Sequence, residues 1–441
     1  MGSAVAQGRG EVVVGDIRGI INPVMAGYVT RVLDDAERTN AAAVVFTMDT
    51  PGGLVDSMRE INQRILAAKV PVLVYVAPNG ARAGSAGVYI TYAAHLAAMA
   101  PTTNIGSATP VSVGDNGGEQ QLSPEMRSKL TNDAVAQIRA LAEQRGRNAE
   151  FAEQAVREAT NLQASEALRQ GVVNYVATDV PDLLRQADGA RVRTATGDVV
   201  LRTADAPVRS ADMSGLERLL LAITNPTIAY ILLSVGSLGL IIELYNPGSI
   251  FPGVIGGISL LLAFYALGTL PVSYAGLGLL LFGLALFALE PFVVSHGILG
   301  VGGLLAFVAG SLLLVQAPDS APFLQVAPAA IAAMTAVMAL FFFVILGAIL
   351  SARRKRVVTG REGLLGAHGT VLRSAITPGV EGLVRVQGEL WSARSEARPL
   401  AVGADVVVVS MEGLRLTVRD APVVAAAAAP VTAPVAEPHR V

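Results

Sequence analysis

The sequence predicts three successive parts: an α/β domain, an α-helical transmembrane domain and a small all-β barrel. Over residues 1–203, short apolar runs alternate with helical patterns, which is typical of a parallel sheet covered by helices on both faces. Between residues 224 and 317 only two side chains are charged, a profile that no soluble core has. Over residues 361–420, five short β patterns separated by glycine turns predict the barrel.

Composition agrees with a membrane portion, because 52% of the 441 residues are hydrophobic and 15% are charged. The formal charge of −2 gives no support for nucleic-acid binding. No cysteine is present, which excludes disulfides, thiol catalysis and cysteine-bound metals, and we expect no cofactor or metal. The first residues, Met1 to Ala4, lack the apolar core of a signal peptide.

Within the first domain the patterns predict a regular alternation of strands and helices. Strands are expected at 12–17, 43–48, 71–76, 96–99 and 172–176, and helices at 23–38, 54–68, 85–95, 124–144, 149–159, 164–170 and 181–187. A hairpin over 191–202, turning at Thr196-Gly197-Asp198, closes the domain. Residues 106–121 are expected to form a surface loop, or a mobile flap beside the site, and residues 204–222 a linker.

Ser85 lies between glycines where the strand 71–76 gives way to the helix 85–95. Its hydroxyl would then lie at a helix N-terminus, where the helix dipole and free backbone amides favour developing negative charge. That is a good place for a nucleophile. The alternative is an ordinary serine N-cap.

The segment Asp49-Thr50-Pro51-Gly52-Gly53 follows the buried strand 43–48. A Gly-Gly turn at the carboxyl end of a parallel strand lets the backbone approach a ligand with its amides exposed. Such an amide can form half of an oxyanion hole, and the amide of Ala86 can form the other half. The alternative is a simple tight turn.

The candidate base follows from elimination. The four histidines are His95, His296, His368 and His439, and only His95 lies in the first domain, at the wrong angular position on the helix of Ser85. Lysine remains, because arginine cannot lose its proton whereas a desolvated lysine can. The only lysines are Lys69, Lys129 and Lys355, and Lys129 begins a helix in the same domain. A solvated surface lysine is the alternative.

Several motifs in register resemble the NfeD family of membrane-bound serine proteases. They are Asp49-Thr50-Pro51-Gly52-Gly53, Arg82-Ala83-Gly84-Ser85-Ala86-Gly87, His95-Leu96-Ala97-Ala98-Met99-Ala100-Pro101, Ile105-Gly106-Ser107-Ala108, and Lys129-Leu130-Thr131-Asn132 with Gly146-Arg147-Asn148. The resemblance spans nearly the whole chain, in the order protease domain, membrane domain, OB-like barrel.

This resemblance implies a Clp/crotonase-like protease domain related to the Clp protease and signal peptide peptidase superfamily. It implies Ser85 as nucleophile, Lys129 as general base, and the amides of Gly53 and Ala86 as the oxyanion hole. It also implies stomatin- or prohibitin-like membrane partners, a polypeptide substrate with hydrophobic or membrane-protein segments, and a homo-oligomer.

The transmembrane domain is expected over 223–352 with about five spans, near 227–245, 253–270, 274–290, 297–315 and 327–350. The third span is short, and a re-entrant segment is the alternative. Glu243 and Glu290 lie beside predicted span ends, which favours an interfacial position over a proton path. Arg353-Arg354-Lys355-Arg356 marks the cytoplasmic side, so with five spans the protease domain is extracytoplasmic and the barrel cytoplasmic in a multi-pass cell-membrane protein.

The barrel, expected over 357–421, has neither a basic face nor aromatic rows, so we expect a protein-contact module rather than an oligonucleotide binder. The tail 422–441, rich in alanine and proline, is expected to be disordered. Two other functions compete with the protease. A crotonase-type acyl-CoA enzyme explains neither the Ser85–Lys129 pair nor the membrane segment, whereas a scaffold for membrane microdomains, with vestigial proteolysis, remains open.

Overall fold

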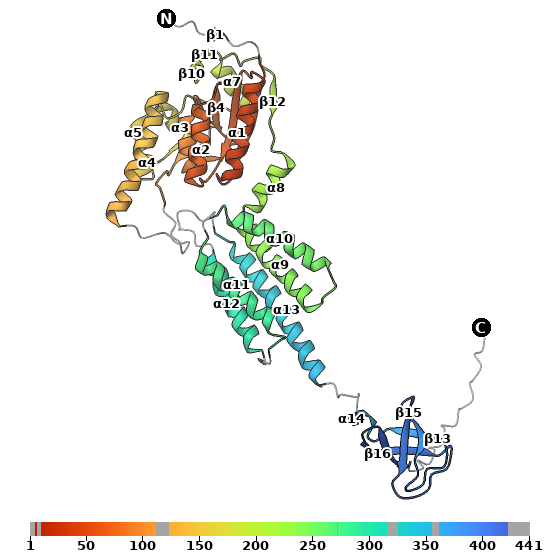
Figure 1. Ribbon diagram of the computed structural model, residues 1–441. Coiled ribbons are helices and arrows are strands. Elements are labelled where there is room, and N and C mark those ends of the chain that lie inside the picture. The colour runs from red at the N-terminus through yellow and green to blue at the C-terminus, as the bar shows by residue number, and fades with distance from the viewer. Residues whose placement is uncertain are drawn as a thin grey trace, which may run out of the picture. The chain divides into compact units, whose positions relative to one another are not determined.

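A computed structural model describes residues 5–6, 10–111, 123–270, 272–293, 295, 297–314, 325–354 and 361–421 (Figure 1). Contacts divide the chain into two compact units, residues 1–344 and residues 345–441. The first unit holds the α/β domain and the apolar helices up to residue 344, and the second holds the barrel. The three predicted parts, an α/β domain, apolar helices and a β-barrel, are therefore all confirmed.

The α/β domain is built on a six-stranded parallel sheet in the order β12-β2-β3-β4-β6-β9. Its strands are β2 (Val12–Arg18), β3 (Ala43–Asp49), β4 (Val72–Val76), β6 (Leu96–Met99), β9 (Tyr175–Val176) and β12 (Val208–Ser210). All five residues of β4 are buried, as expected of a strand covered on both faces. The carboxyl ends of β3 and β4 lead into the two glycine-containing segments singled out above.

Helices cover both faces of this sheet, which creates two separate hydrophobic cores. The larger core is packed by α1 (Pro23–Arg38), α2 (Val55–Leu66), α3 (Ala86–Ala93), α4 (Pro124–Arg145), α5 (Ala149–Arg157) and α6 (Ala164–Arg169). The smaller core lies on the other face, under α7 (Val180–Ala187) and the antiparallel hairpin β10 (Arg191–Thr194) and β11 (Gly197–Val200), with which β1 (Val5–Ala6) pairs. The predicted alternation and the hairpin are confirmed.

Three short strand segments differ from expectation. β5 (Arg82–Gly84), β7 (Asn104–Gly106) and β8 (Asn161–Gln163) form a second sheet in the order β5-β7-β8, and none was predicted. The expected linker 204–222 contains β12, paired with β2, and α8 (Gly215–Ile223). A three-residue strand is too short to show a detectable alternation of apolar and polar side chains. Such a segment becomes a strand because it pairs with a neighbour. Of the predicted loop 106–121, residues 112–121 lie outside the described residues.

Five apolar helices follow α8 at the predicted positions: α9 (Pro226–Tyr245), α10 (Phe251–Leu267), α11 (Tyr274–Leu289), α12 (Ile298–Leu314) and α13 (Pro328–Arg354). Within the described residues, two segments are long and apolar enough to cross a membrane, Pro226–Tyr245 and Pro328–Gly347. The other three are 16 or 17 residues long, or about 24–26 Å at 1.5 Å per residue, against a hydrocarbon core of about 30 Å.

Glycines let these helices pack backbone to backbone in pairs. A Cβ on Gly239 of α9 would lie 2.6 Å from the carbonyl oxygen of Pro252, and one on Gly283 of α11 would lie 2.7 Å from that of Gly303. Close approach through small residues is how apolar helices associate where water cannot drive packing. The four helices therefore form two tight hairpins, α9 with α10 and α11 with α12.

The two acidic residues of this region accept hydrogen bonds at loop and helix ends. The buried carboxylate of Glu290 accepts hydrogen bonds from the backbone amides of Gly297 and Gly300, both at 2.9 Å, and so caps the start of α12. Glu243 accepts a hydrogen bond of 3.0 Å from the Ser249 hydroxyl in the turn after α9. Glu290 therefore has a structural role as the cap of α12, whereas Glu243 is bound within the turn after α9.

The second unit is a closed five-stranded barrel in the order β13-β14-β15-β17-β16, the strand order of an OB fold. Its strands are β13 (His368–Arg373), β14 (Gly382–Val386), β15 (Glu389–Ser395), β16 (Asp405–Glu412) and β17 (Arg415–Asp420). A short helix, α14 (Arg361–Leu364), precedes them. The predicted tail 422–441 and the basic residues Lys355 and Arg356 lie outside the described residues.

Candidate active site

The segment after β3 and the segment before α3 are joined by backbone hydrogen bonds. The Thr50 amide donates to the Arg82 carbonyl at 2.8 Å, and the Gly84 amide donates to the Thr50 carbonyl at 3.0 Å. The Arg82 amide also donates to the Asp49 carboxylate at 3.1 Å. The two motifs lie far apart in the sequence but form one backbone assembly beside Ser85.

Ser85 is the N-cap of α3 but does not use its hydroxyl to cap the helix. Its φ is 50° and its ψ is −111°, a conformation that a serine rarely adopts. Strained backbone of this kind persists only where the surroundings fix it, and it concentrates at functional sites. The ordinary N-cap interpretation is therefore wrong for this hydroxyl, which caps no helix amide among the described residues.

The Gly52-Gly53 turn must be glycine because it lies against other backbone and against Ser85. A Cβ on Gly52, whose φ is +122°, would lie 2.6 Å from the Cβ of Ser85. A Cβ on Gly53 would lie 2.1 Å from the carbonyl oxygen of Ile21. Neither space can accept a side chain, so the two glycines bring the turn into contact with the serine.

The amides of Gly53 and Ala86 are available to a ligand. Neither donates any of the hydrogen bonds found among the described residues, whereas the neighbouring amide of Gly52 donates to the Thr50 hydroxyl at 3.0 Å. Both residues line the same cleft as Ser85. Two free amides beside a hydroxyl are the elements of an oxyanion hole, so the structure brings three of the four predicted site residues together.

This cleft has a volume of about 220 Å³ and a mostly apolar lining from α2, α3, α4 and the segment after β7. Besides Gly53, Ser85 and Ala86 it is lined by Val55, Met58, Arg59, Tyr89, Ala108, Pro110, Val111, Leu130, Asp133, Ala134 and Gln137. Arg59 and Asp133 form an ion pair of 3.2 Å between α2 and α4. The cleft can accept an apolar side chain next to Ser85.

Lys129 lies on α4 immediately before Leu130, which lines the cleft, and one turn before Asp133. Its side chain is exposed, and it is not among the residues that line the cleft in the described part of the chain. Lys129 shares this exposure with the whole first part of α4, because residues 124–130 are all exposed. The fourth predicted residue is thus near the cleft along the chain but is not brought to Ser85.

His95 has a structural environment. It is buried, and its Nδ1 accepts a hydrogen bond from the Val72 amide at 3.1 Å. Burial, together with the charges of Arg145 and Arg147, lowers the pKa of His95 to about 3. A histidine that is neutral at neutral pH and bonded to β4 by Nδ1 is part of the packing, in agreement with the elimination of a Ser-His pair.

Sequence reasoning missed two kinds of supporting residue. The buried Thr50 hydroxyl donates to the Gly19 carbonyl at 2.7 Å and accepts from the Gly52 amide, which fixes the glycine turn. Arg147 is also buried and donates to the carbonyls of Thr91 and Tyr92 at 2.8 and 3.1 Å, at the C-terminal end of α3. The Thr-Pro-Gly pattern, which is typical of a turn closed by a side chain, could have indicated the role of Thr50. No neighbouring residue in the sequence indicates the role of Arg147.

Three family models match successive parts of the chain. The NfeD1b N-terminal domain matches residues 11–192, the NfeD integral membrane domain matches residues 227–348, and the NfeD-like C-terminal, partner-binding domain matches residues 361–419. The boundaries follow the α/β domain, the apolar helices and the barrel.

Curated relatives match along most of their length. The chain is 36% identical to "Membrane-bound protease PH1510" of Pyrococcus horikoshii over 416 residues, covering 92% of each chain. It is 29% identical to "Membrane protein NfeD1b" of Bacillus subtilis over 425 residues, covering 90% of each. A solved structure, described as a lysine-to-alanine mutant of the 1510-N membrane-bound stomatin-specific protease in complex with a substrate peptide, is 37% identical, with a TM-score of 0.46 over 48% of this chain and 97% of that one.

The buried neutral His95 predicts a stability that falls at acidic pH. Its pKa is about 3 in the folded chain and about 6.5 when unfolded, so between these values the unfolded state binds the extra proton. The free energy of unfolding should therefore fall as pH drops below about 6.5, with a slope of up to ~1.4 kcal/mol per pH unit. Urea unfolding of the full chain in detergent, followed by tyrosine circular dichroism, measures this slope.

The variant His95→Asn keeps an acceptor for the Val72 amide but cannot take up the proton, so its slope should be smaller. The control is His368→Asn, which changes a histidine exposed on the barrel and should leave the slope unchanged. Equal slopes for wild type and His95→Asn would contradict this account.

Proposed function

Because the chain belongs to the NfeD family, we propose that it is an integral-membrane serine endopeptidase with Ser85 as nucleophile and Lys129 as general base. The observation that carries this proposal is that Ser85, Gly53 and Ala86 line one cleft, and that neither the Ser85 hydroxyl nor the two amides donate a hydrogen bond to any described residue. That arrangement can hold the negative charge that develops when a hydroxyl attacks a carbonyl.

The reaction proceeds in two steps. The neutral amine of Lys129 takes the proton of Ser85 as Oγ attacks the scissile carbonyl, and the oxyanion accepts hydrogen bonds from the amides of Gly53 and Ala86. The Lys129 ammonium then returns this proton to the amine nitrogen of the substrate as the carbon–nitrogen bond breaks, which gives an acyl-enzyme. Water then adds to the ester and releases the acid, restoring Ser85. Because Lys129 is exposed and does not line the cleft among the described residues, the proposal requires that binding of the polypeptide bring its amine to Ser85.

The apolar lining of the cleft supports a substrate with hydrophobic residues beside the scissile bond, as in membrane-protein segments. Membership of the family, with the C-terminal model described as partner-binding, supports stomatin- or prohibitin-like membrane proteins as partners. We extend the proposal to contact with membrane lipid and to a homo-oligomer.

One observation favours a second candidate function: in the part of the chain that the structure describes, Lys129 does not line the cleft. A scaffold that organises membrane microdomains, with vestigial proteolysis, needs no working dyad. An acyl probe that labels active serines separates the two functions, because labelling that is lost in Ser85→Ala supports the peptidase and the absence of labelling in wild type supports the scaffold.

Ser85→Ala should abolish turnover, leaving only the residual acceleration of roughly 10³–10⁴-fold over water that an oxyanion hole and binding provide. The measurement is cleavage of an apolar peptide by the full chain in detergent. Ser128→Ala, at an exposed position on α4, is the matched control and should keep its activity. Near wild-type cleavage by Ser85→Ala would exclude this nucleophile.

Lys129→Arg should lose as much activity as Lys129→Ala, on the order of 10²–10⁴-fold, because arginine keeps the charge but cannot accept a proton near neutral pH. Wild-type cleavage should also rise with pH, since the neutral amine is the competent form. Lys69→Arg, which changes the other lysine of the domain, is the control. Substantial pH-independent turnover by Lys129→Arg would rule out the base.

We also propose a multi-pass topology with the protease domain outside the cell and the barrel in the cytoplasm. The basic run Arg353-Arg354-Lys355-Arg356 in the sequence and the count of five apolar helices among the described residues support it. Single cysteines introduced as Ser3→Cys and Val423→Cys, both outside the described residues, should then react with an impermeant reagent from opposite sides of the membrane. Labelling from the same side would mean that the number of spans is even.

A further inference from the structure

Helix α8 (Gly215–Ile223) connects the α/β domain to the first long apolar helix, and it exposes leucines. The exposed fraction is 65% for Leu216 and 52% for Leu219. These residues lie three positions apart and therefore share one face of the helix. Helix α8 ends at Ile223 and α9 begins at Pro226, so only two residues separate α8 from a segment that is long and apolar enough to cross a membrane.

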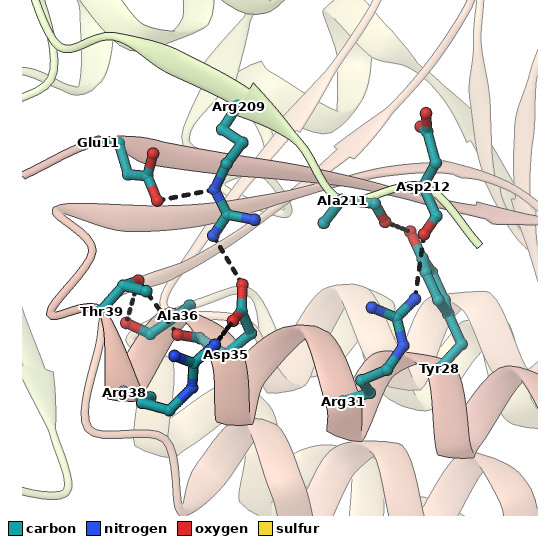
Figure 2. Close-up of polar contacts among 10 residues, drawn as sticks. All are labelled: Glu11, Tyr28, Arg31, Asp35, Ala36, Arg38, Thr39, Arg209, Ala211 and Asp212. Atoms are coloured by element: carbon teal, nitrogen blue, oxygen red, sulfur yellow. Dashed lines mark hydrogen bonds and ion pairs between the residues drawn. The ribbon is translucent and has the colours of Figure 1, made fainter. Parts of the chain in front are cut away.

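The segment before α8, from Arg209 to Asp212, is held against the α/β domain by hydrogen bonds and ion pairs (Figure 2). Arg209 of β12 donates to the carboxylates of Glu11 and Asp35, both at 2.7 Å. The hydroxyl of Tyr28 on α1 donates to the Ala211 carbonyl at 2.8 Å. These contacts come in addition to the pairing of β12 with β2, so the segment has a fixed course along α1.

Helix α8 itself is also held against α1, with a defined rotation about its axis. Arg31 of α1 makes a bidentate ion pair with Glu217, at 2.7 and 2.8 Å. It also donates to the Asp212 carbonyl at 3.1 Å (Figure 2). Glu217 also completes a capping box with Ser214. At the other end, the Asn22 side-chain amide donates to the Thr224 hydroxyl at 2.9 Å.

This rotation separates two faces of α8. Glu217 contacts α1, and Arg218 and Leu221 line a cavity of about 240 Å³ with residues of β2 and α1, among them Asp16 and Tyr28. Leu216 and Leu219 are not among the residues that line this cavity in the described part of the chain. The leucine face is therefore turned away from the α/β domain.

We propose that α8 is an interfacial helix whose leucine face, Leu216 with Leu219, enters the lipid bilayer at the headgroup level. We infer that lipid covers the leucine face because α8 is continuous with α9. A nine-residue helix spans about 14 Å and cannot lie far from the bilayer that α9 enters. An apolar face beside a polar one is the signature of helices that lie in the membrane surface. The clamp of Arg31 on Glu217 then fixes the height of the α/β domain over the lipid. The proposal rests on the membrane domain and is independent of proteolysis.

The absence of cysteine makes a depth measurement direct. Single variants Leu216→Cys, Leu219→Cys and Arg218→Cys of the full chain are labelled with the fluorophore NBD and reconstituted into phosphatidylcholine–phosphatidylglycerol vesicles. The vesicles carry a spin-label quencher either near the headgroup or at the end of the acyl chains. Emission at positions 216 and 219 should be lost to the shallow quencher more than to the deep one, at a depth of roughly 5–10 Å.

Position 218, turned toward the cavity, is the matched control and should be quenched far less than its neighbours. Lys69→Cys, on the α/β domain, gives the value for a site in water. Equal quenching at 216, 218 and 219 would overturn the proposal. So would disulfide formation between two copies through Leu216→Cys without quenching, because the leucine face would then be covered by a second chain. Peptide cleavage by each labelled variant is scored separately, so that loss of activity cannot be mistaken for a change of depth.

Discussion

The candidate site depends on the hydrogen-bonded junction between the chain after β3 and the chain before α3. There the Thr50 amide donates to the Arg82 carbonyl, and the Thr50 carbonyl accepts from the Gly84 amide. The absence of side chains at Gly52 and Gly53 lets the turn touch Ser85 on one side and Ile21 on the other. A single methyl group at Gly53 would overlap the Ile21 carbonyl and push the turn away from the serine. The position of the Gly53 amide therefore follows from backbone packing, together with the hydrogen bonds of the Thr50 hydroxyl.

The same junction links the site to the rest of the molecule. Ile21 forms a backbone bridge with Gly53, and the next residue, Asn22, caps α1 and reaches Thr224 just before α9. The Gly53 amide, proposed for the oxyanion hole, is thus linked to the start of α9 through the contacts of Ile21 and Asn22. The proposed interfacial position of α8 and the geometry of the site share this corner of the α/β domain, where α1 begins.

Much of this arrangement could be predicted because it rests on local rules. A buried strand that ends in Gly-Gly, and a serine between glycines at a strand-to-helix turn, mark Gly53, Ser85 and Ala86 by backbone chemistry alone. The rest depends on partners distant in sequence. β12 exists because β2 offers an edge, and Arg147 matters because α3 ends beside it. The exposure of Lys129 follows from the packing of α4, which no spacing in the sequence specifies.

The arginines at the far end of α3 have an electrostatic consequence. Arg145 and Arg147 bind the last carbonyls of the helix, so two guanidinium charges stand at the end where the helix dipole is negative. The eight residues of α3 place them about 12 Å from Ser85. At an effective dielectric constant of about 20, one positive charge at that distance lowers the energy of an anion by ~1.4 kcal/mol. The helix end that would otherwise repel the proposed oxyanion would thereby attract it from a distance, without contact with the substrate.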